Sequence, residues 1–87
     1  LNGDFVIRRA EELALRLERL TRDPSQRIEM LWKICLGRGP SEEEQALATE
    51  FLKEQSTRLG SSKDSEQAAW RDLCQSVLGC NEALYLP

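Results

Sequence analysis

LGRGPSEEE, residues 36–44, is the stretch of the chain that decides the fold. Gly37 can adopt the left-handed conformation that closes a helix, and Pro40 cannot continue one because its nitrogen carries no hydrogen. Ser41 and Glu44, three residues apart, have the spacing of a capping box, in which each side chain bonds the other residue's backbone N–H. The stretch therefore predicts one helix that ends near residue 36 and another that begins near residue 42.

Apolar side chains recur at helical spacing on both sides of this stretch. Asp23 before Pro24 is a helix start, Ser65 or Asp64 is expected to cap a later helix, and Gly79 is expected to end it. Together these signals predict four main helices near residues 4–21, 24–36, 42–57 and 65–78, followed by a short C-terminal turn. We therefore expect an all-α fold, arranged as a compact bundle.

The apolar faces also predict how the helices pack. Apolar side chains cover a wide arc of residues 24–36, so this helix is expected to be the central one. Trp32 and Trp70 are expected to share one core, and a binding platform is the alternative for Trp32. The helix over 42–57 is expected to be peripheral, because its inner face carries only Leu47, Ala48, Phe51 and Leu52.

Length and charge bound the class of protein. A chain of 87 residues supports one small domain with a single core, so residues 1–87 are assigned to one helical domain. The first residue is Leu1 and the only methionine is Met30, which predicts a fragment of a larger protein. A net charge of −3 argues against a nucleic-acid module, since such modules carry a basic face. No apolar run approaches the roughly 20 residues of a transmembrane helix, so no membrane insertion is expected.

Cysteine and histidine usage limits the chemistry. Cys35, Cys74 and Cys80 form no C-x-x-C pair, and the chain has no histidine. This excludes Ser-His-Asp and Cys-His catalysis, C-x-x-C-H haem attachment and a Cys2His2 zinc site, whereas a three-thiolate metal site stays formally possible. Cys35 and Cys74 fall on core faces, which favours buried, unpaired thiols. We expect no catalytic residue, metal or cofactor within this fragment; whether the parent protein is an enzyme stays open.

The structural or interaction candidates are Arg38, Glu43, Glu44, Trp32, Trp70, Asn81 and Tyr85. Arg38 lies at the corner between two helices, where its guanidinium is expected to bond helix-end carbonyls or the carboxylates of Glu43 and Glu44. Binding of an external carboxylate or sugar acid is the alternative. Asn81 falls on the apolar side of the last helix, so it is expected to pin the chain through its hydrogen bonds, or else to contact a ligand.

Acids and bases alternate along the first predicted helix. Arg8 and Glu12, Glu12 and Arg16, and Glu18 and Arg22 are each four residues apart, a spacing that favours ion pairs on a solvated face. A face that binds anions is the alternative interpretation.

Several separated segments together resemble one family: residues 2–6, 27–28, 31–32, 36–38, 40–41, 43–44, 70, 73–75, 81–82 and 84–85. The chain is similar to the C-terminal helical part of a large planctomycete domain of unknown function that often accompanies a cytochrome-c-like module. The resemblance implies that Pro87 lies near the natural C-terminus and that a haem, if the parent has one, belongs to another module. It also implies export to the cell envelope, where Cys74 could be oxidised with another cysteine.

The leading functional hypothesis is a non-catalytic helical module, structural or interacting, that binds the rest of its parent chain or another protein. Apolar residues at both ends favour it, namely Leu1, Phe5 and Ile7 with residues 84–86; the alternative is a tail folded over the first helix. A second hypothesis is a fragment that completes an enzyme active site. A helix-turn-helix DNA reader is disfavoured, because acids crowd its would-be recognition helix.

Overall fold

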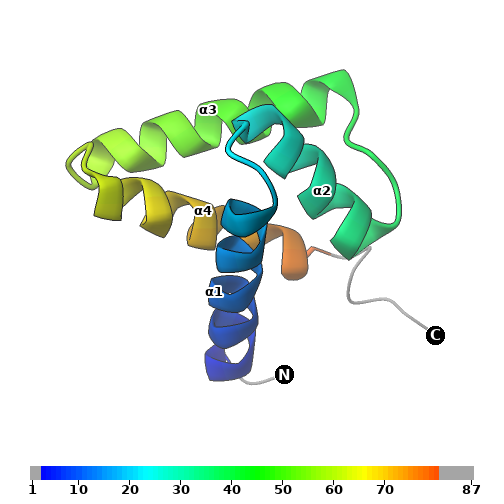
Figure 1. The fold of residues 1–87 in the computed structure, drawn as a ribbon, viewed down its shortest axis with the longest axis horizontal. Coiled ribbons are helices and arrows are strands. Elements are labelled where there is room, and N and C mark those ends of the chain that lie inside the picture. Colours follow the sequence, from blue (N-terminus) through cyan, green and yellow to red (C-terminus); the bar gives the residue numbers. More distant parts are fainter. Residues whose placement is uncertain (1–2, 81–87) are drawn as a thin grey trace.

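The computed structural model describes residues 3–80, and this part of the chain forms four α-helices (Figure 1). They are α1 (Gly3–Leu20), α2 (Pro24–Leu36), α3 (Glu42–Arg58) and α4 (Lys63–Leu78). The predicted all-α bundle of four main helices is confirmed. The predicted C-terminal turn lies outside the described residues. No helix within residues 3–80 combines the length and the apolar character needed to cross a membrane.

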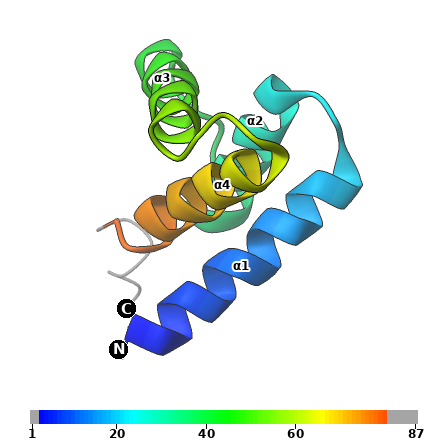
Figure 2. The ribbon, with the colours of Figure 1, turned by 90° about the vertical axis from the view of Figure 1, so that its left-hand side faces the viewer.

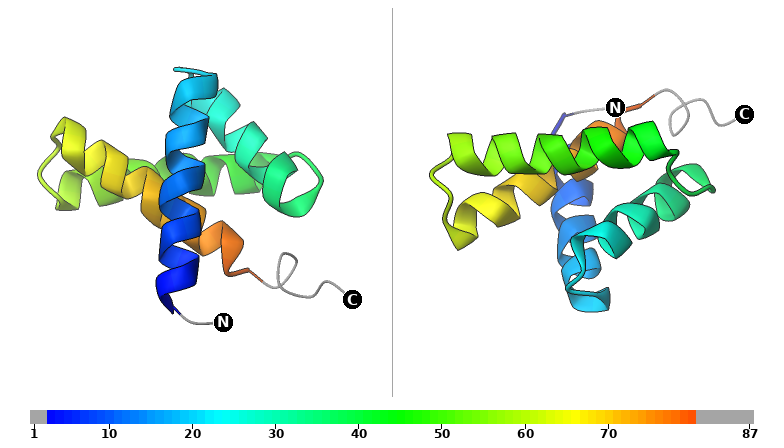
Figure 3. Two further views of the ribbon diagram at one scale, coloured as in Figure 1. Left: turned by 60° about the horizontal axis from the view of Figure 1, so that its bottom comes forward. Right: turned by 90° about the horizontal axis from the view of Figure 1, so that it is seen from above.

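Helix α4 lies at the centre of the bundle. It packs against α1 on one side and α3 on the other, and α1 and α3 do not contact each other (Figure 2). Helices α3 and α4 run side by side as a hairpin, α1 crosses α4, and α2 closes one end (Figure 3). The expectation that α2 is central is therefore wrong: α2 buries three residues, whereas α4 buries Ser65, Ala69, Leu73, Cys74 and Val77.

The predicted corner between α2 and α3 is present in detail. Gly37 adopts the left-handed conformation, with φ of 72°, and its N–H donates to the carbonyl of Lys33 at 3.1 Å. At the start of α3, the N–H of Glu44 donates to Ser41 Oγ at 3.1 Å, and the N–H of Ser41 donates to Glu44 Oε1 at 2.9 Å. The capping box is confirmed, and it gives hydrogen-bond partners to two backbone N–H groups at the start of α3.

The start of α4 differs from the prediction. The helix begins at Lys63, and its N-cap is Ser62, whose Oγ accepts from the N–H of Ser65 at 3.1 Å. Ser65 is buried in the first turn and donates to the carbonyl of Leu59 at 2.7 Å. The positive φ values of Gly60 (111°) and Ser61 (57°) turn the chain within two residues, so the helix starts earlier than a cap at Ser65 or Asp64 would allow.

One hydrophobic core joins the helices. Trp32 is 7% exposed and belongs to it, and the half-buried Trp70 packs against it, so the prediction that both tryptophans share one core is confirmed. The buried apolar residues are Ala10, Leu13, Leu17, Ile28, Leu31, Trp32, Ala48, Ala69, Leu73, Cys74 and Val77. Because each helix contributes to this set, no helix can detach without exposing apolar surface to water.

Candidate functional site

Arg38 joins the end of α2 to the first turn of α3. Its Nη1 donates to Glu44 Oε1 at 2.8 Å and its Nη2 donates to Glu44 Oε2 at 3.0 Å, so the two side chains form a bidentate ion pair. Nη1 also donates to the carbonyl of Gly39 at 3.2 Å. Of the two expected carboxylates, Glu44 is therefore the partner. Glu43 is exposed, and no ion pair joins it to another residue within 3–80.

These contacts perturb Glu44. The hydrogen bonds from Arg38, and after them the bond from the Ser41 backbone, lower the pKa of Glu44 to about 2. The Trp32 indole N–H makes a smaller contribution to the lowered pKa of Glu44, and its Nε1 is buried without a hydrogen-bond partner within residues 3–80. The Glu44 carboxylate is thus held ionised beside a buried indole donor.

An apolar groove begins beside this carboxylate and runs between α3 and α4. It encloses about 710 Å³, and Trp32 and Leu36 of α2 close one end. Its apolar lining from the other two helices is Leu47, Ala48, Phe51, Leu73 and Val77. Leu47 is 69% exposed, so the prediction that it faces inward is wrong. An exposed leucine beside a half-buried phenylalanine leaves this side of the hairpin apolar and uncovered within the described structure.

The charges that line the groove have one sign. Glu44, Glu50 and Glu54 line it, and no lysine or arginine is among its lining residues. Glu44 is engaged by Arg38, whereas Glu50 and Glu54 are exposed and form no ion pair within residues 3–80. Glu50 and Glu54 also line a second, open hollow along α3, which they share with Lys53 and Arg58. The groove therefore combines an apolar floor with a negative rim.

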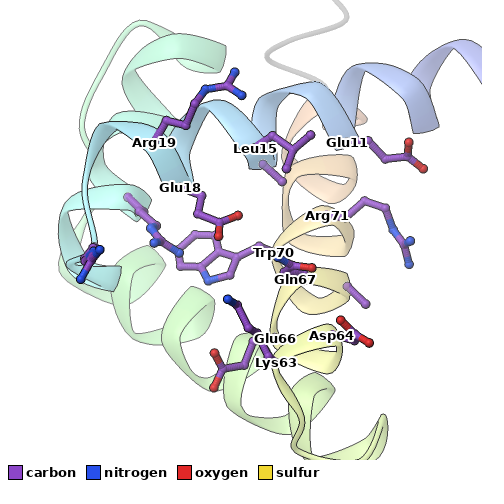
Figure 4. A pocket seen from close by; sticks show the side chains of 14 residues that line it. Glu11, Leu15, Glu18, Arg19, Lys63, Asp64, Glu66, Gln67, Trp70 and Arg71 are labelled. Atoms are coloured by element: carbon purple, nitrogen blue, oxygen red, sulfur yellow. The ribbon is translucent and has the colours of Figure 1, made fainter.

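A second cleft of about 960 Å³ lies between α1 and α4, and Figure 4 shows its lining. The Arg27 guanidinium carbon lies 5.5 Å from the centre of the Trp70 ring, a cation–π contact, and Arg27 Nε donates to the carbonyl of Thr21 at 2.7 Å. Glu18 is directed toward Trp70, whereas Arg19 is directed away from it (Figure 4).

Acids and bases alternate around this cleft, so it presents no uniform charge to a ligand. The bases are Arg19, Arg22, Arg27, Lys63 and Arg71, and the acids are Glu11, Glu18, Asp64 and Glu66. The predicted ion pairs of α1, Arg8–Glu12, Glu12–Arg16 and Glu18–Arg22, are not among the pairs within 4.0 Å that the described structure contains. Such exposed pairs gain little energy, so the long side chains remain solvated instead.

The seven candidates from the sequence fall into separate places. Trp32 and Glu44 line the groove and Arg38 braces its end, whereas Trp70 lines the second cleft. Asn81 and Tyr85 lie outside the described residues. Sequence reasoning missed Glu50 and Glu54 as a rim, although their spacing from Leu47 along one helix could have indicated it.

The three cysteines are free thiols, Cys74 buried and the other two half-buried. Within residues 3–80, no group of three or more His, Cys, Asp or Glu side chains is placed to hold a metal ion. Comparisons with protein-family models, curated proteins and solved structures find no match to this chain.

Proposed function

We propose that this chain is a non-catalytic interaction module, and that the groove between α3 and α4 binds a polypeptide segment with one apolar face flanked by lysine or arginine. The observation that carries the proposal is the exposed Leu47 beside an acidic rim with no lining base. An apolar segment would bury Leu47 and Phe51, and its basic side chains would meet Glu50 and Glu54.

The shape of the groove suits a helical segment. Its α3 side is formed by residues at positions 44, 47, 48, 50, 51 and 54, which lie along one side of that helix, and its α4 side by residues 73, 76 and 77. Two neighbouring helices with a furrow between them accept a third helix whose side chains enter that furrow. The bound segment would lie over the furrow and form a three-helix bundle with α3 and α4.

The probe is a capped helical peptide of leucine and lysine with its leucines on one face; the matched peptide carries glutamate in place of lysine. We expect the lysine peptide to bind at least about tenfold more tightly, a difference of about 1.4 kcal/mol. We also expect its affinity to fall as salt is added, since exposed charges are screened. Amide chemical shifts in the labelled chain locate the bound peptide, with the largest changes at Leu47, Phe51 and Val77.

Matched variants connect binding to the groove. Glu50→Lys with Glu54→Lys is expected to abolish the preference for lysine, whereas the exposed pair Glu12→Lys with Glu29→Lys changes the net charge equally but lies outside the groove. Leu47→Ser is expected to weaken binding, and Leu20→Ser, which alters another exposed leucine, is not. Equal affinity for the two peptides, or unimpaired binding by the Glu50/Glu54 variant, would refute the proposal.

The resemblance described above supports a source for the segment. We propose that the parent protein is exported to the cell envelope and that its remaining part supplies the amphipathic segment. Trp32, Leu36, Glu44 and Leu73 both carry the resemblance and line the groove. Co-expression of this chain with the upstream part of its parent tests the idea, because protection of α3 amides from hydrogen exchange is expected to rise in the complex and to stay unchanged if the groove is not used.

A further inference from the structure

The outer side of α1 carries a basic strip. Its members are exposed and three or four residues apart, so they lie along one side of the helix; they are Arg8, Arg9, Glu12, Arg16 and Arg19. The buried residues Ala10, Leu13 and Leu17 have the same spacing on the side that faces the core. The strip therefore concentrates positive charge on one surface of a chain whose net charge is −3.

Exposed leucines flank the basic strip. Leu15 and Leu20 are each 51% exposed and border it on its two sides. No ion pair within 4.0 Å joins the strip's arginines to an acid within residues 3–80. The outer side of α1 thus combines exposed leucine with arginine, which is the chemistry proposed above for the segment that the groove binds.

The groove between α3 and α4 is the counterpart of the basic strip. Its rim carries the exposed acids Glu50 and Glu54, and Leu47 beside them is 69% exposed. Helices α1 and α3 lie on opposite sides of α4 and do not contact each other (Figure 2). No described residue of α1 lines the groove. The strip and the groove of one chain therefore face different neighbours.

We propose that copies of this chain associate head to tail, with the basic strip of one copy in the groove of the next. Leu20 of the first copy would cover Leu47 of the second, and Arg16 and Arg19 would meet Glu50 and Glu54. Leu20 is favoured over Leu15, because Leu15 lines the cleft between α1 and α4. The inference rests on the binding mode proposed for the groove, and a segment of the parent would compete with this contact.

The geometry of the contact determines the kind of assembly. The two surfaces that meet are different, so each added copy presents another strip at one end and another groove at the other. Such a heterologous contact produces chains of copies that grow with concentration. Added salt is expected to weaken them, since exposed charges are screened beyond about 8 Å at 0.15 M ionic strength.

Sedimentation of the chain from about 10 μM to about 1 mM tests the proposal, because this range detects a dissociation constant of up to about 1 mM. The weight-average mass is expected to rise with concentration past that of a dimer, and to fall as sodium chloride is added. A mass that stays at the monomer value, or that levels off at the dimer, would refute the head-to-tail contact.

Two variants remove the two surfaces separately. The groove variant carries Leu47→Ser, Glu50→Gln and Glu54→Gln, and the strip variant carries Arg16→Gln, Arg19→Gln and Leu20→Ser. Each alone is expected to associate at least about tenfold more weakly than the wild-type chain. Their equimolar mixture is expected to form a one-to-one dimer that does not grow, because it retains one intact strip and one intact groove.

The matched control is Lys33→Gln with Ile34→Ser, which alters an exposed base and an exposed apolar residue outside both surfaces and is expected to associate like the wild-type chain. Far-ultraviolet circular dichroism verifies that every variant has folded. A mixture that stays monomeric, or assembly that survives in either variant, would overturn the proposal.

The strip variant also separates this inference from the proposed function. Its groove is intact, so it is expected to bind the lysine peptide. If it binds that peptide while the wild-type chain stays monomeric, the groove binds its segment and the head-to-tail contact is wrong. If it does not bind the peptide, the proposed function fails as well.

Discussion

Arg38 and Glu44 form a bidentate ion pair, with N–O distances of 2.8 and 3.0 Å, although their side chains are 43% and 31% exposed. The same carboxylate completes the capping box with Ser41. One side chain therefore serves as a helix cap and as an anchor for the preceding corner. The two roles link the end of α2 to the start of α3 more tightly than either contact alone.

Arg38→Ala is expected to lower the urea midpoint of unfolding, because the corner loses a planar donor pair. Arg38→Lys is expected to restore only part of the loss, since an ammonium cannot form the two parallel bonds. Arg71→Ala is the control, because Arg71 meets the adjacent Asp72 through a single contact of 3.4 Å. Identical midpoints for the wild-type chain and Arg38→Ala would show that the corner does not depend on the pair.

Glu44 is expected to make stability depend on pH in acid. Its pKa is lowered in the folded chain to about 2 from an ordinary value of 4.5, so the ionised form favours folding. That stabilisation is complete above the unfolded-state pKa and is lost as the pH falls through the folded-state pKa. The free energy of unfolding, measured with urea from neutral pH down to about pH 2, should fall accordingly. In Glu44→Gln the fall should be smaller, because the contribution of the Glu44 carboxylate is absent. Arg38→Ala should raise the folded-state pKa of Glu44 and so reduce the acid-dependent loss of stability. If stability falls with pH in Glu44→Gln as it does in the wild-type chain, Glu44 is not the group responsible.

The start of α4 can be tested by comparing two neighbouring positions. Ser62→Ala is expected to cost about 1 kcal/mol of unfolding free energy, the usual loss for a serine N-cap. Asp64→Ala is expected to cost less, because Asp64 only adds a charge near the helix start. Urea denaturation of both variants measures the difference. If Asp64→Ala lost more stability than Ser62→Ala, Asp64 would be the N-cap, as the sequence suggested.

Two leucines distinguish the core from the groove. Leu31 is fully buried, so Leu31→Ala is expected to cost about 2–5 kcal/mol. Leu47 is mostly exposed, so Leu47→Ala is expected to change the unfolding free energy by less than about 0.5 kcal/mol. Chemical denaturation gives both values. A cost for Leu47→Ala close to that of Leu31→Ala would mean that the groove is closed in solution.

Sequence reasoning located the helices through local chemistry. Gly37, Asp23 and the Ser41–Glu44 box act within one turn of chain, so their patterns could be recognised without knowledge of the tertiary structure. The cap of α4 was misplaced because Ser62, Asp64 and Ser65 are all suitable caps, and the turn at Gly60 and Ser61 decides among them. Local signals therefore predicted a helix end correctly where the sequence offered one capping residue, and less well where it offered several.

Packing was predicted less well, since it depends on neighbours distant in sequence. Periodicity placed Leu47 on the apolar face of α3, but that face is wider than the surface that α4 covers. The same limit explains why α2 was expected to be central: apolar residues indicate a buried face and do not identify the helix that has neighbours on both sides. The role of Arg38 was easier to predict, because its partner Glu44 lies only six residues away in the sequence.

The packing of α1 on α4 constrains the order in which the protein can fold during synthesis. Of the four described helices, α1 is translated before the others and packs against α4, which is translated after them, and α1 makes no contact with α3. Its apolar face, with Ala10, Leu13 and Leu17, therefore lacks its main partner until α4 has been translated, because α2 contacts α1 less extensively. Contacts so distant in sequence slow folding and lengthen the exposure of apolar surface. A nascent chain that stops before α4 thus lacks the helix that organises the others, and is the form most open to aggregation and to chaperone binding.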